Sequence, residues 1–188
     1  LKPENIFLVP TDAGGVVGIV KHMPGHGRAS VDSHQELPVV TADAETLAVD
    51  LEPFVTLRAA PMGMTAHIIY TAWDAERPAS LSPTVIGDII RGQIGFDGLL
   101  MSDDLDMKAL KGDIPSLAVG VVEAGCDLAL NCWARMDEMV GIAERLPDIS
   151  ELSRARLDRA MATIPPEVDD TPLDVLLARR DALIGVMV

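Results

Sequence analysis

Residues 99–131 read LLMSDDLDMKALKGDIPSLAVGVVEAGCDLALN and contain one complete structural unit of this chain. The apolar run at 99–102 leads into an acidic loop, and a helical stretch begins around Ile114 and closes at Gly125. A second apolar run follows at 127–131. This succession of apolar run, polar loop, helical stretch and apolar run is typical of a βα unit that returns to a parallel sheet.

The same alternation occurs twice before this unit. Apolar runs at 16–21 and 62–70 are each followed by a helical stretch. Thr41 is the expected N-cap of the first of these helices. The pair Ser82-Pro83 is typical of the start of the second, because proline is favoured at the first helical position. A further helical stretch follows the last apolar run, so the sequence predicts four βα units.

Four βα units make either half of a (β/α)8 barrel or a small open α/β sheet, and length alone does not separate the two. A complete barrel takes about 250 residues, so the barrel interpretation makes this chain about the C-terminal half of one. We predict a single α/β domain of the (β/α)8 TIM-barrel type across residues 1–188. Residues 1–15 are expected to be an irregular start, and residues 148–188 are expected to form C-terminal helices.

The composition argues against several classes of protein. With 48% hydrophobic and 23% charged residues, the 188-residue chain can bury a sizeable core and is globular. Its 15 basic and 29 acidic side chains give a net charge of −14, which repels a phosphate backbone and argues against nucleic acid as a partner. No apolar run approaches the roughly 18 to 20 residues of a membrane span, and the start lacks the order of a signal peptide. A cytoplasmic location is therefore expected.

The two cysteines, Cys126 and Cys132, lie in the apolar stretch GCDLALNCW. Their spacing matches none of the common zinc motifs. We expect both to be buried thiols.

Polar side chains follow the predicted strands at their C-terminal ends, where the active sites of parallel α/β folds lie. Lys21 and His22 end the first strand, His67 lies on the second, and Asp103 follows the third. The loop KHMPGHG at 21–27 combines a proline and two glycines with a lysine and two histidines. Such an irregular loop costs conformational free energy on folding, which favours a functional role for it. Although loops are polar in any case, we expect these residues to form one site.

Two short pairs carry candidate acid–base or nucleophilic chemistry. Asp32 and His34 stand two residues apart, so an extended loop can let the carboxylate orient the imidazole. Taken alone, a turn hydrogen bond beside a solvent-exposed histidine explains this pair better. Asp103 and Asp104 are adjacent, so only one is expected to enter the site while the other faces elsewhere, for instance a helix N-terminus. For His26, a structural hydrogen bond to the loop backbone is favoured over a substrate contact.

Three motifs resemble a known family. The run KHMPGHGRASVDSH (21–34) resembles the signature loop of bacterial β-N-acetylglucosaminidases of glycoside hydrolase family 3. The run GFDGLLMSDDLDM (95–107) resembles the nucleophile strand of the same family, and MTAHIIY (64–70) resembles the strand between them. The motifs are long and correctly ordered, and the resemblance covers residues 16–132.

This resemblance implies a retaining glycosidase that releases terminal β-linked N-acetylglucosamine. Asp103 would be the nucleophile, and His34, paired with Asp32, would act first as acid and then as base. The residues expected to bind substrate are Lys21, His22 and His67. The implied substrates are muropeptide fragments of peptidoglycan, handled in the cytoplasm without a cofactor or a metal ion. Arg28, inside the loop, is expected to be solvent-exposed rather than in contact with substrate.

The sequence also departs from the family, whose members carry further substrate-binding aspartate and arginine residues in the N-terminal half of the barrel. Two other interpretations therefore stay open. A metal-dependent hydrolase would use as ligands His22, His26, Asp32, His34 and Asp103, although Lys21 beside them would repel a cation. A non-catalytic half-barrel would form homo-oligomers through exposed strand edges, or bind a complementing half.

Overall fold

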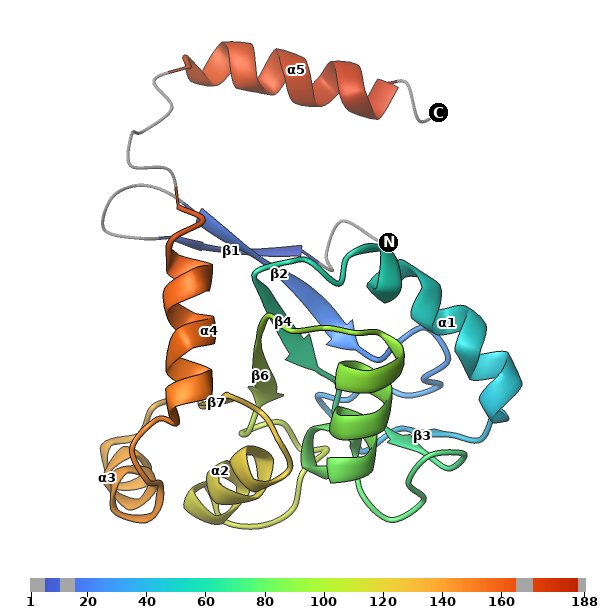
Figure 1. The fold of residues 1–188 in the computed structure, drawn as a ribbon, viewed down its shortest axis with the longest axis vertical. Helices are drawn as coiled ribbons and strands as arrows, with labels where there is room; N and C mark the ends of the chain where they lie inside the picture. Colours follow the sequence, from blue (N-terminus) through green and yellow to red (C-terminus); the bar gives the residue numbers. More distant parts are fainter. Residues whose placement is uncertain (1–5, 11–15, 165–170, 186–188) are drawn as a thin grey trace.

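The computed structural model describes residues 6–10, 16–164 and 171–185. Its main feature is a five-stranded sheet in the order β1-β2-β4-β6-β7 (Figure 1). The parallel strands, in sequence order, are β2 (Val16–Met23), β4 (Met62–Thr65), β6 (Leu99–Asp104) and β7 (Leu128–Leu130). Consecutive parallel strands lie side by side in the sheet, as expected for successive βα units.

Two segments differ from the sequence prediction. Residues 6–10, expected to belong to an irregular start, form strand β1 (Ile6–Pro10), which pairs antiparallel with β2. Residues 1–5 and 11–15 lie outside the described residues. The run predicted as one strand at 62–70 is split, because only its first part joins the main sheet as β4. Its last part, β5 (Ile69–Tyr70), pairs instead with β3 (Val39–Val40) in a separate two-stranded sheet.

Helical segments follow the strands as predicted. They are α1 (Ala44–Thr56), the short 3₁₀ segment η2 (Ala79–Leu81), the π-helix η3 (Val85–Gln93), α2 (Ile114–Glu123), α3 (Met136–Arg145), α4 (Glu151–Met161) and α5 (Leu173–Gly185). Asp43 rather than Thr41 caps α1, since its carboxylate accepts a hydrogen bond from the Thr46 N–H at 2.8 Å. Ser82 does act at the start of its helix, where its hydroxyl accepts from the Val85 N–H at 3.1 Å.

The two faces of the sheet are buried in different ways. One face packs against α1, η3 and α2 in the larger hydrophobic core, to which Val20, Leu100 and Phe54 belong. The other face carries the alternate strand residues, including Val17, Met62, Leu99 and Met101. Those residues pack with Leu157, Ala160 and Ile164, from α4 and the residues just after it. The first face is therefore the helix-covered outside of the βα series, and the second is its inside.

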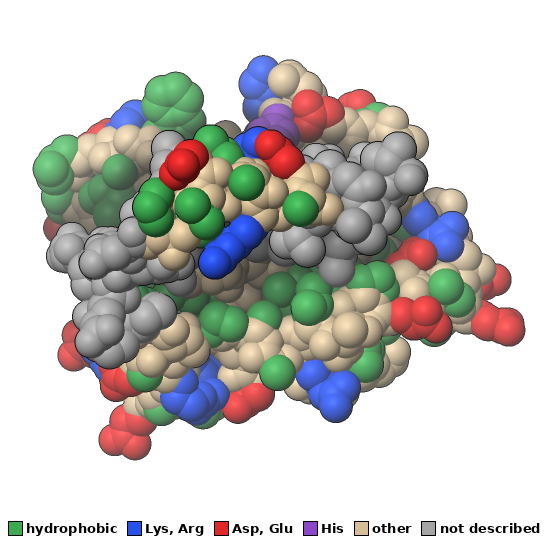
Figure 2. Space-filling model, turned by 90° about the horizontal axis from the view of Figure 1, so that it is seen from above, with side chains coloured by type: hydrophobic (Ala, Val, Ile, Leu, Met, Phe, Trp, Pro, Cys, Tyr) green, Lys and Arg blue, Asp and Glu red, His purple; other side chains and the backbone are tan. Residues whose placement is uncertain are grey.

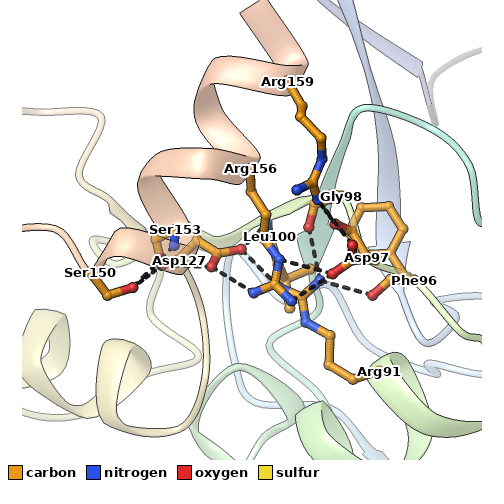
Figure 3. A network of polar contacts seen from close by, with 10 residues as sticks. All are labelled: Arg91, Phe96, Asp97, Gly98, Leu100, Asp127, Ser150, Ser153, Arg156 and Arg159. Carbon is orange, nitrogen blue, oxygen red and sulfur yellow. Dashed lines mark hydrogen bonds and ion pairs between the residues drawn. The ribbon is translucent and has the colours of Figure 1, made fainter.

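A buried ion-pair network holds α4 in place (Figure 3). Asp127 stands just before β7 with its side chain only 3% exposed. One of its carboxylate oxygens accepts from Arg91 and from the Leu100 N–H, both at 2.8 Å. The other accepts from Arg156 at 3.0 Å and from the Ser153 hydroxyl at 2.7 Å, and both of these residues belong to α4. The network thus joins α4, η3 and the sheet at one carboxylate.

One face of the molecule is mixed in character. Figure 2 looks onto the molecule from the side of α5 and shows acidic and basic side chains interspersed with hydrophobic ones. Within the described residues, no helix is both long enough and apolar enough to cross a membrane. Cys126 is buried as predicted, but Cys132 is exposed, which contradicts the prediction. Cys132 lies beyond the last residue of β7, at the rim of the sheet rather than within it.

Candidate active site

Asp103 lies near the C-terminal end of β6. Leu99 and Met101 belong to the inner cluster, and Leu100 between them belongs to the outer core. The pairing of β6 with β7 is irregular between Met101 and Asp104, so Asp103 is placed by its contact with His22 and not by the alternation of the strand. Its side chain is 13% exposed, and its Oδ1 accepts a hydrogen bond from the Asp104 N–H at 2.9 Å. A nearly buried carboxylate stands where the interior of a βα series opens.

Asp104, the neighbouring aspartate, is used differently. Its Oδ1 accepts hydrogen bonds from the backbone N–H groups of Cys132 at 2.9 Å and Asp106 at 3.3 Å. These amides belong to loops, so the expectation of a helix N-terminus as its partner is wrong. Asp104 therefore ties the loop after β6 to the loop after β7.

Lys21 and His22, near the end of β2, lie beside Asp103. The His22 Nε2 is 3.5 Å from the Asp103 Oδ2, and the His22 side chain is 20% exposed. Burial lowers the pKa of His22 to about 4, although the charge of Asp103 acts in the opposite direction. Burial also lowers the pKa of Lys21, again against the attraction of Asp103. The Asp103 side chain thus faces an imidazole that is uncharged at neutral pH and lies near the Lys21 amino group.

Asp32 and His34 form a hydrogen-bonded pair in the loop after β2. The Asp32 Oδ1 lies 2.8 Å from the His34 Nδ1 and also accepts from the His34 N–H at 2.9 Å. These bonds, the backbone one first, lower the pKa of the Asp32 carboxyl. A carboxylate at Nδ1 leaves Nε2 as the ring nitrogen that faces outward. Both side chains are exposed, at 60% for Asp32 and 73% for His34.

A series of contacts joins this loop to Asp103. The ring of His26 lies 5.5 Å from that of His22, measured between centroids. The His26 Nε2 is 3.1 Å from the hydroxyl of Ser33, the residue between Asp32 and His34. His26 therefore has a structural partner, but this partner is a side chain rather than the expected backbone group. From Asp103 through His22 and His26 to Ser33, neighbouring side chains lead to the Asp32–His34 pair.

His67 is placed near the site but turned away from solvent. Its side chain is fully buried, with the Nδ1 2.6 Å from the Ser80 hydroxyl and the Nε2 3.0 Å from the Asp104 carbonyl oxygen. Burial lowers the pKa of His67, so the neutral ring donates from Nε2 to the carbonyl and accepts the Ser80 O–H at Nδ1. Both ring nitrogens are occupied. This geometry supports a role in holding the backbone next to Asp103 and not the direct sugar contact that the sequence suggested.

The five residues considered as metal ligands are divided among separate partners. His22 faces Asp103, His26 faces Ser33, and His34 faces Asp32. Among the residues that the structure describes, no group of three or more His, Cys, Asp or Glu side chains is arranged to hold a metal ion.

Several residues that shape the site were not identified from the sequence. They are Asp50, Tyr70, Ser80 and Ser102. Tyr70 donates to the Gly25 carbonyl, and the Ser102 hydroxyl accepts from the Leu130 N–H at 3.0 Å. Each partner lies 13 or more positions away in the chain, so no local motif indicates these contacts.

Comparisons with known proteins identify the family of this chain. Residues 7–165 match the glycosyl hydrolase family 3 N terminal domain. The beta-hexosaminidase of Aromatoleum aromaticum is 38% identical over 186 residues, covering 94% of this chain and 51% of that protein. The beta-hexosaminidase of Alkalilimnicola ehrlichii is 40% identical over 150 residues, covering 77% of this chain and 42% of that protein. The chain therefore spans about half the length of these curated relatives.

Solved structures give the same result. The family 3 β-N-acetylglucosaminidase of Paenibacillus sp. FPU-7 superposes with a TM-score of 0.68 at 34% identity, covering 79% of this chain and 31% of that one. NagZ of Neisseria gonorrhoeae, in complex with N-trifluoroacetyl-D-glucosamine, gives 0.67 at 34% identity, covering 78% of this chain and 43% of that one. The predicted TIM-barrel type is confirmed, and the parallel sheet with its helices is part of such a barrel. This chain belongs to the glycosyl hydrolase family 3 N-terminal domain family.

Proposed function

We propose that this chain supplies the catalytic half of a retaining glycoside hydrolase that removes terminal β-linked N-acetylglucosamine. The observation that carries the proposal is the Asp103 carboxylate near the C-terminal end of β6, with its Oδ2 3.5 Å from the His22 Nε2. A carboxylate at this end of a parallel strand is where barrel enzymes keep their reacting groups. Muropeptide fragments of peptidoglycan are the proposed substrates, with a cytoplasmic location and no cofactor.

The reaction proceeds in two displacements at one carbon. Asp103 attacks the anomeric carbon, so that a C1–Oδ bond forms while the bond to the leaving oxygen breaks, and His34 gives that oxygen its proton. His34 then takes a proton from water, whose oxygen attacks C1 and releases Asp103 as a carboxylate. Both displacements invert the configuration, so the product retains it. Asp32 holds His34 in one orientation throughout, through the bond at Nδ1.

Lys21 and His22 are the proposed ligands of sugar hydroxyl groups. Both have a lowered pKa because of burial, and both lie beside Asp103. A neutral His22 can donate to one hydroxyl or accept from another, whereas a protonated His22 would form a tight ion pair with the nucleophile. His67 supports the site through the Asp104 carbonyl rather than through the sugar.

The names of the similar proteins support this choice of substrate. The curated relatives are named beta-hexosaminidases, and several similar structures are named β-N-acetylglucosaminidases. Since the chain spans about half of the relatives' length, the complete site is proposed to need the other half of a barrel.

The proposal is tested with a chromogenic N-acetylglucosaminide, assayed on this chain and on any longer protein that contains it. Asp103→Asn is expected to lower kcat on the order of 10³-fold or more, because the amide cannot form the intermediate. Asp88→Asn is the matched control, since Asp88 is an exposed acidic residue on η3, and it should keep the rate. Full activity in Asp103→Asn, or an inert whole protein, would overturn the proposal.

Open strand edges favour a second property, association with a complementing half or with another copy. β7 ends the sheet, and its residues are only half-buried. Large apolar side chains are exposed nearby, namely Trp133, Met136, Met139 and Val140. We propose that this edge and the neighbouring α3 are covered in the functional protein. A chain that stays monomeric at high concentration in a sizing experiment, and binds no complementing half-barrel, would contradict this.

A further inference from the structure

The loop between β2 and β3 carries the Asp32–His34 pair and is fixed to its surroundings at identifiable points. Near its start, Tyr70 donates a hydrogen bond to the Gly25 carbonyl. A side chain at Gly25 would meet Phe54 at 3.7 Å and Asp50 at 3.8 Å, so the loop backbone lies directly on α1. Further along, buried Ser33 faces His26. Between these two points lies Arg28.

Arg28 binds the same turn of α1 through its side chain. The Arg28 Nε lies 2.5 Å from the Asp50 Oδ2, and the Arg28 Nη2 lies 3.1 Å from the Asp50 Oδ1. The carboxylate hydrogen bond raises the pKa of Arg28. Two parallel bonds between a planar guanidinium and a carboxylate fix orientation as well as distance. The pair connects positions 22 residues apart and so joins the loop to the helix.

We propose that the Arg28–Asp50 ion pair positions the Asp32–His34 loop for proton transfer, so that both are positioning residues of the hydrolase. This inference rests on the proposed function and extends it to residues outside the reacting groups. Arg28 precedes Asp32 by four residues, and the dyad itself is exposed. The orientation of the dyad therefore depends on how the loop is held on α1. Without the ion pair this segment can shift, which lowers the rate of the step in which His34 protonates the leaving oxygen.

Leaving groups of different basicity separate this role from a general loss of structure. The value of kcat/KM reports the steps up to departure of the leaving group. A dinitrophenolate leaves without a proton, whereas the sugar oxygen of a disaccharide needs one from His34. Arg28→Ala and Asp50→Ala are each expected to lower kcat/KM for the disaccharide about 3- to 10-fold, and for the dinitrophenyl glycoside less than about 2-fold. The measurements use the whole protein that contains this chain.

Charge exchange supplies the decisive control. The double variant Arg28→Asp with Asp50→Arg restores the ion pair in reverse, and we expect it to recover most of the disaccharide rate. Glu52→Ala removes an exposed acidic residue from the same helix and should leave both substrates unaffected. Equal losses on both substrates, no loss at all, or no recovery in the exchanged variant would each overturn the inference.

Hydrogen exchange of residues 24–37 provides a second readout that needs no activity. Exchange should be faster in each single variant than in the parent protein and return toward the parent rate in the charge-exchanged protein. Unchanged exchange in the single variants would also refute the role of the ion pair. Asp103→Asn distinguishes a failure of the proposed function from a failure of the ion-pair role. If that variant stays active, the proposed function fails, whereas if it is inactive and Arg28→Ala behaves like the parent, only this inference fails.

Discussion

Removing the charge of Asp127 is expected to destabilise the protein more than almost any other single polar change. Asp127 accepts two hydrogen bonds on each carboxylate oxygen, and its side chain is 3% exposed (Figure 3). The side chains of Arg91 and Arg156 are themselves only 17% and 12% exposed. Asp127→Asn keeps the shape but leaves two buried guanidinium groups facing a neutral amide.

The magnitude follows from the cost of an uncompensated buried charge. Breaking a buried ion pair by removing one partner costs about 3–5 kcal/mol. Because Arg156 also binds Asp97 at 2.8 Å, part of its charge stays compensated, and we expect a loss of about 3 kcal/mol, near the lower end. For a chain of this size that corresponds to a fall in Tm of roughly 6–12 °C.

Urea unfolding followed by circular dichroism measures this loss as a change in midpoint at constant m-value. Asp97→Asn is the matched control, because it removes another carboxylate from the same arginine. Asp97 is 71% exposed, so its removal should cost less than about 1 kcal/mol. If Asp127→Asn lowers the free energy of unfolding by less than about 1 kcal/mol, or by no more than Asp97→Asn does, then this network does not hold α4 on the sheet.

Three further predictions concern the site and its scaffold. The pKa of His22 is lowered from 6.5 to about 4 in the folded protein, so as the pH falls below 6.5 this histidine is protonated in the unfolded chain but not in the folded one. The free energy of unfolding should therefore fall by about 1–3 kcal/mol between pH 6.5 and 4. His22→Gln should flatten that part of the curve, and an unchanged slope would contradict the assignment. His67→Phe leaves the Ser80 hydroxyl and the Asp104 carbonyl without their hydrogen-bond partner, so the free energy of unfolding measured in urea should fall by about 1–3 kcal/mol. An unchanged free energy of unfolding would argue against these two hydrogen bonds. Gly98→Ala should destabilise the protein strongly, because the added Cβ would lie 2.5 Å from the Ala60 carbonyl oxygen. Gly87→Ala adds a Cβ with nothing within 4 Å and should be neutral or stabilising by up to about 1 kcal/mol. Similar effects of the two variants would contradict the close packing at the start of β6.

Much of the fold can be predicted from the sequence, because strand and helix periodicity are local properties. The four parallel strands are found close to their expected places. The split of residues 62–70 could not be foreseen, since the backbone beyond β4 bonds to distant segments. The Ile69 N–H donates to the Pro38 carbonyl, and the Thr71 N–H donates to the Val40 carbonyl. These hydrogen bonds to distant residues pair the segment with β3 instead of the main sheet, and the local pattern of apolar residues does not predict them.

The sequence also predicts candidate reacting groups, but it does not indicate the residues that hold them in place. The family resemblance of two motifs points to Asp103 and the pair Asp32–His34, and the structure places Asp103 at the end of β6 and the bonded pair in the loop after β2. The role of His67 changed because Ser80 and the Asp104 backbone occupy its ring. Such partners are determined by how distant segments pack. Spacing in the sequence therefore indicates which groups can react, and the structure is needed to show which ones face the substrate.

Trapping the covalent intermediate identifies the nucleophile and so decides whether Asp103 has that role. The whole protein containing this chain is incubated with an activated N-acetylglucosaminide whose fluorinated sugar ring slows hydrolysis, and the intact mass is measured before peptide mapping. We expect one added glycosyl group, on the peptide that contains residues 99–104 and specifically on Asp103, and no addition in Asp103→Asn. Turnover without any adduct, or an adduct on another residue, would contradict it.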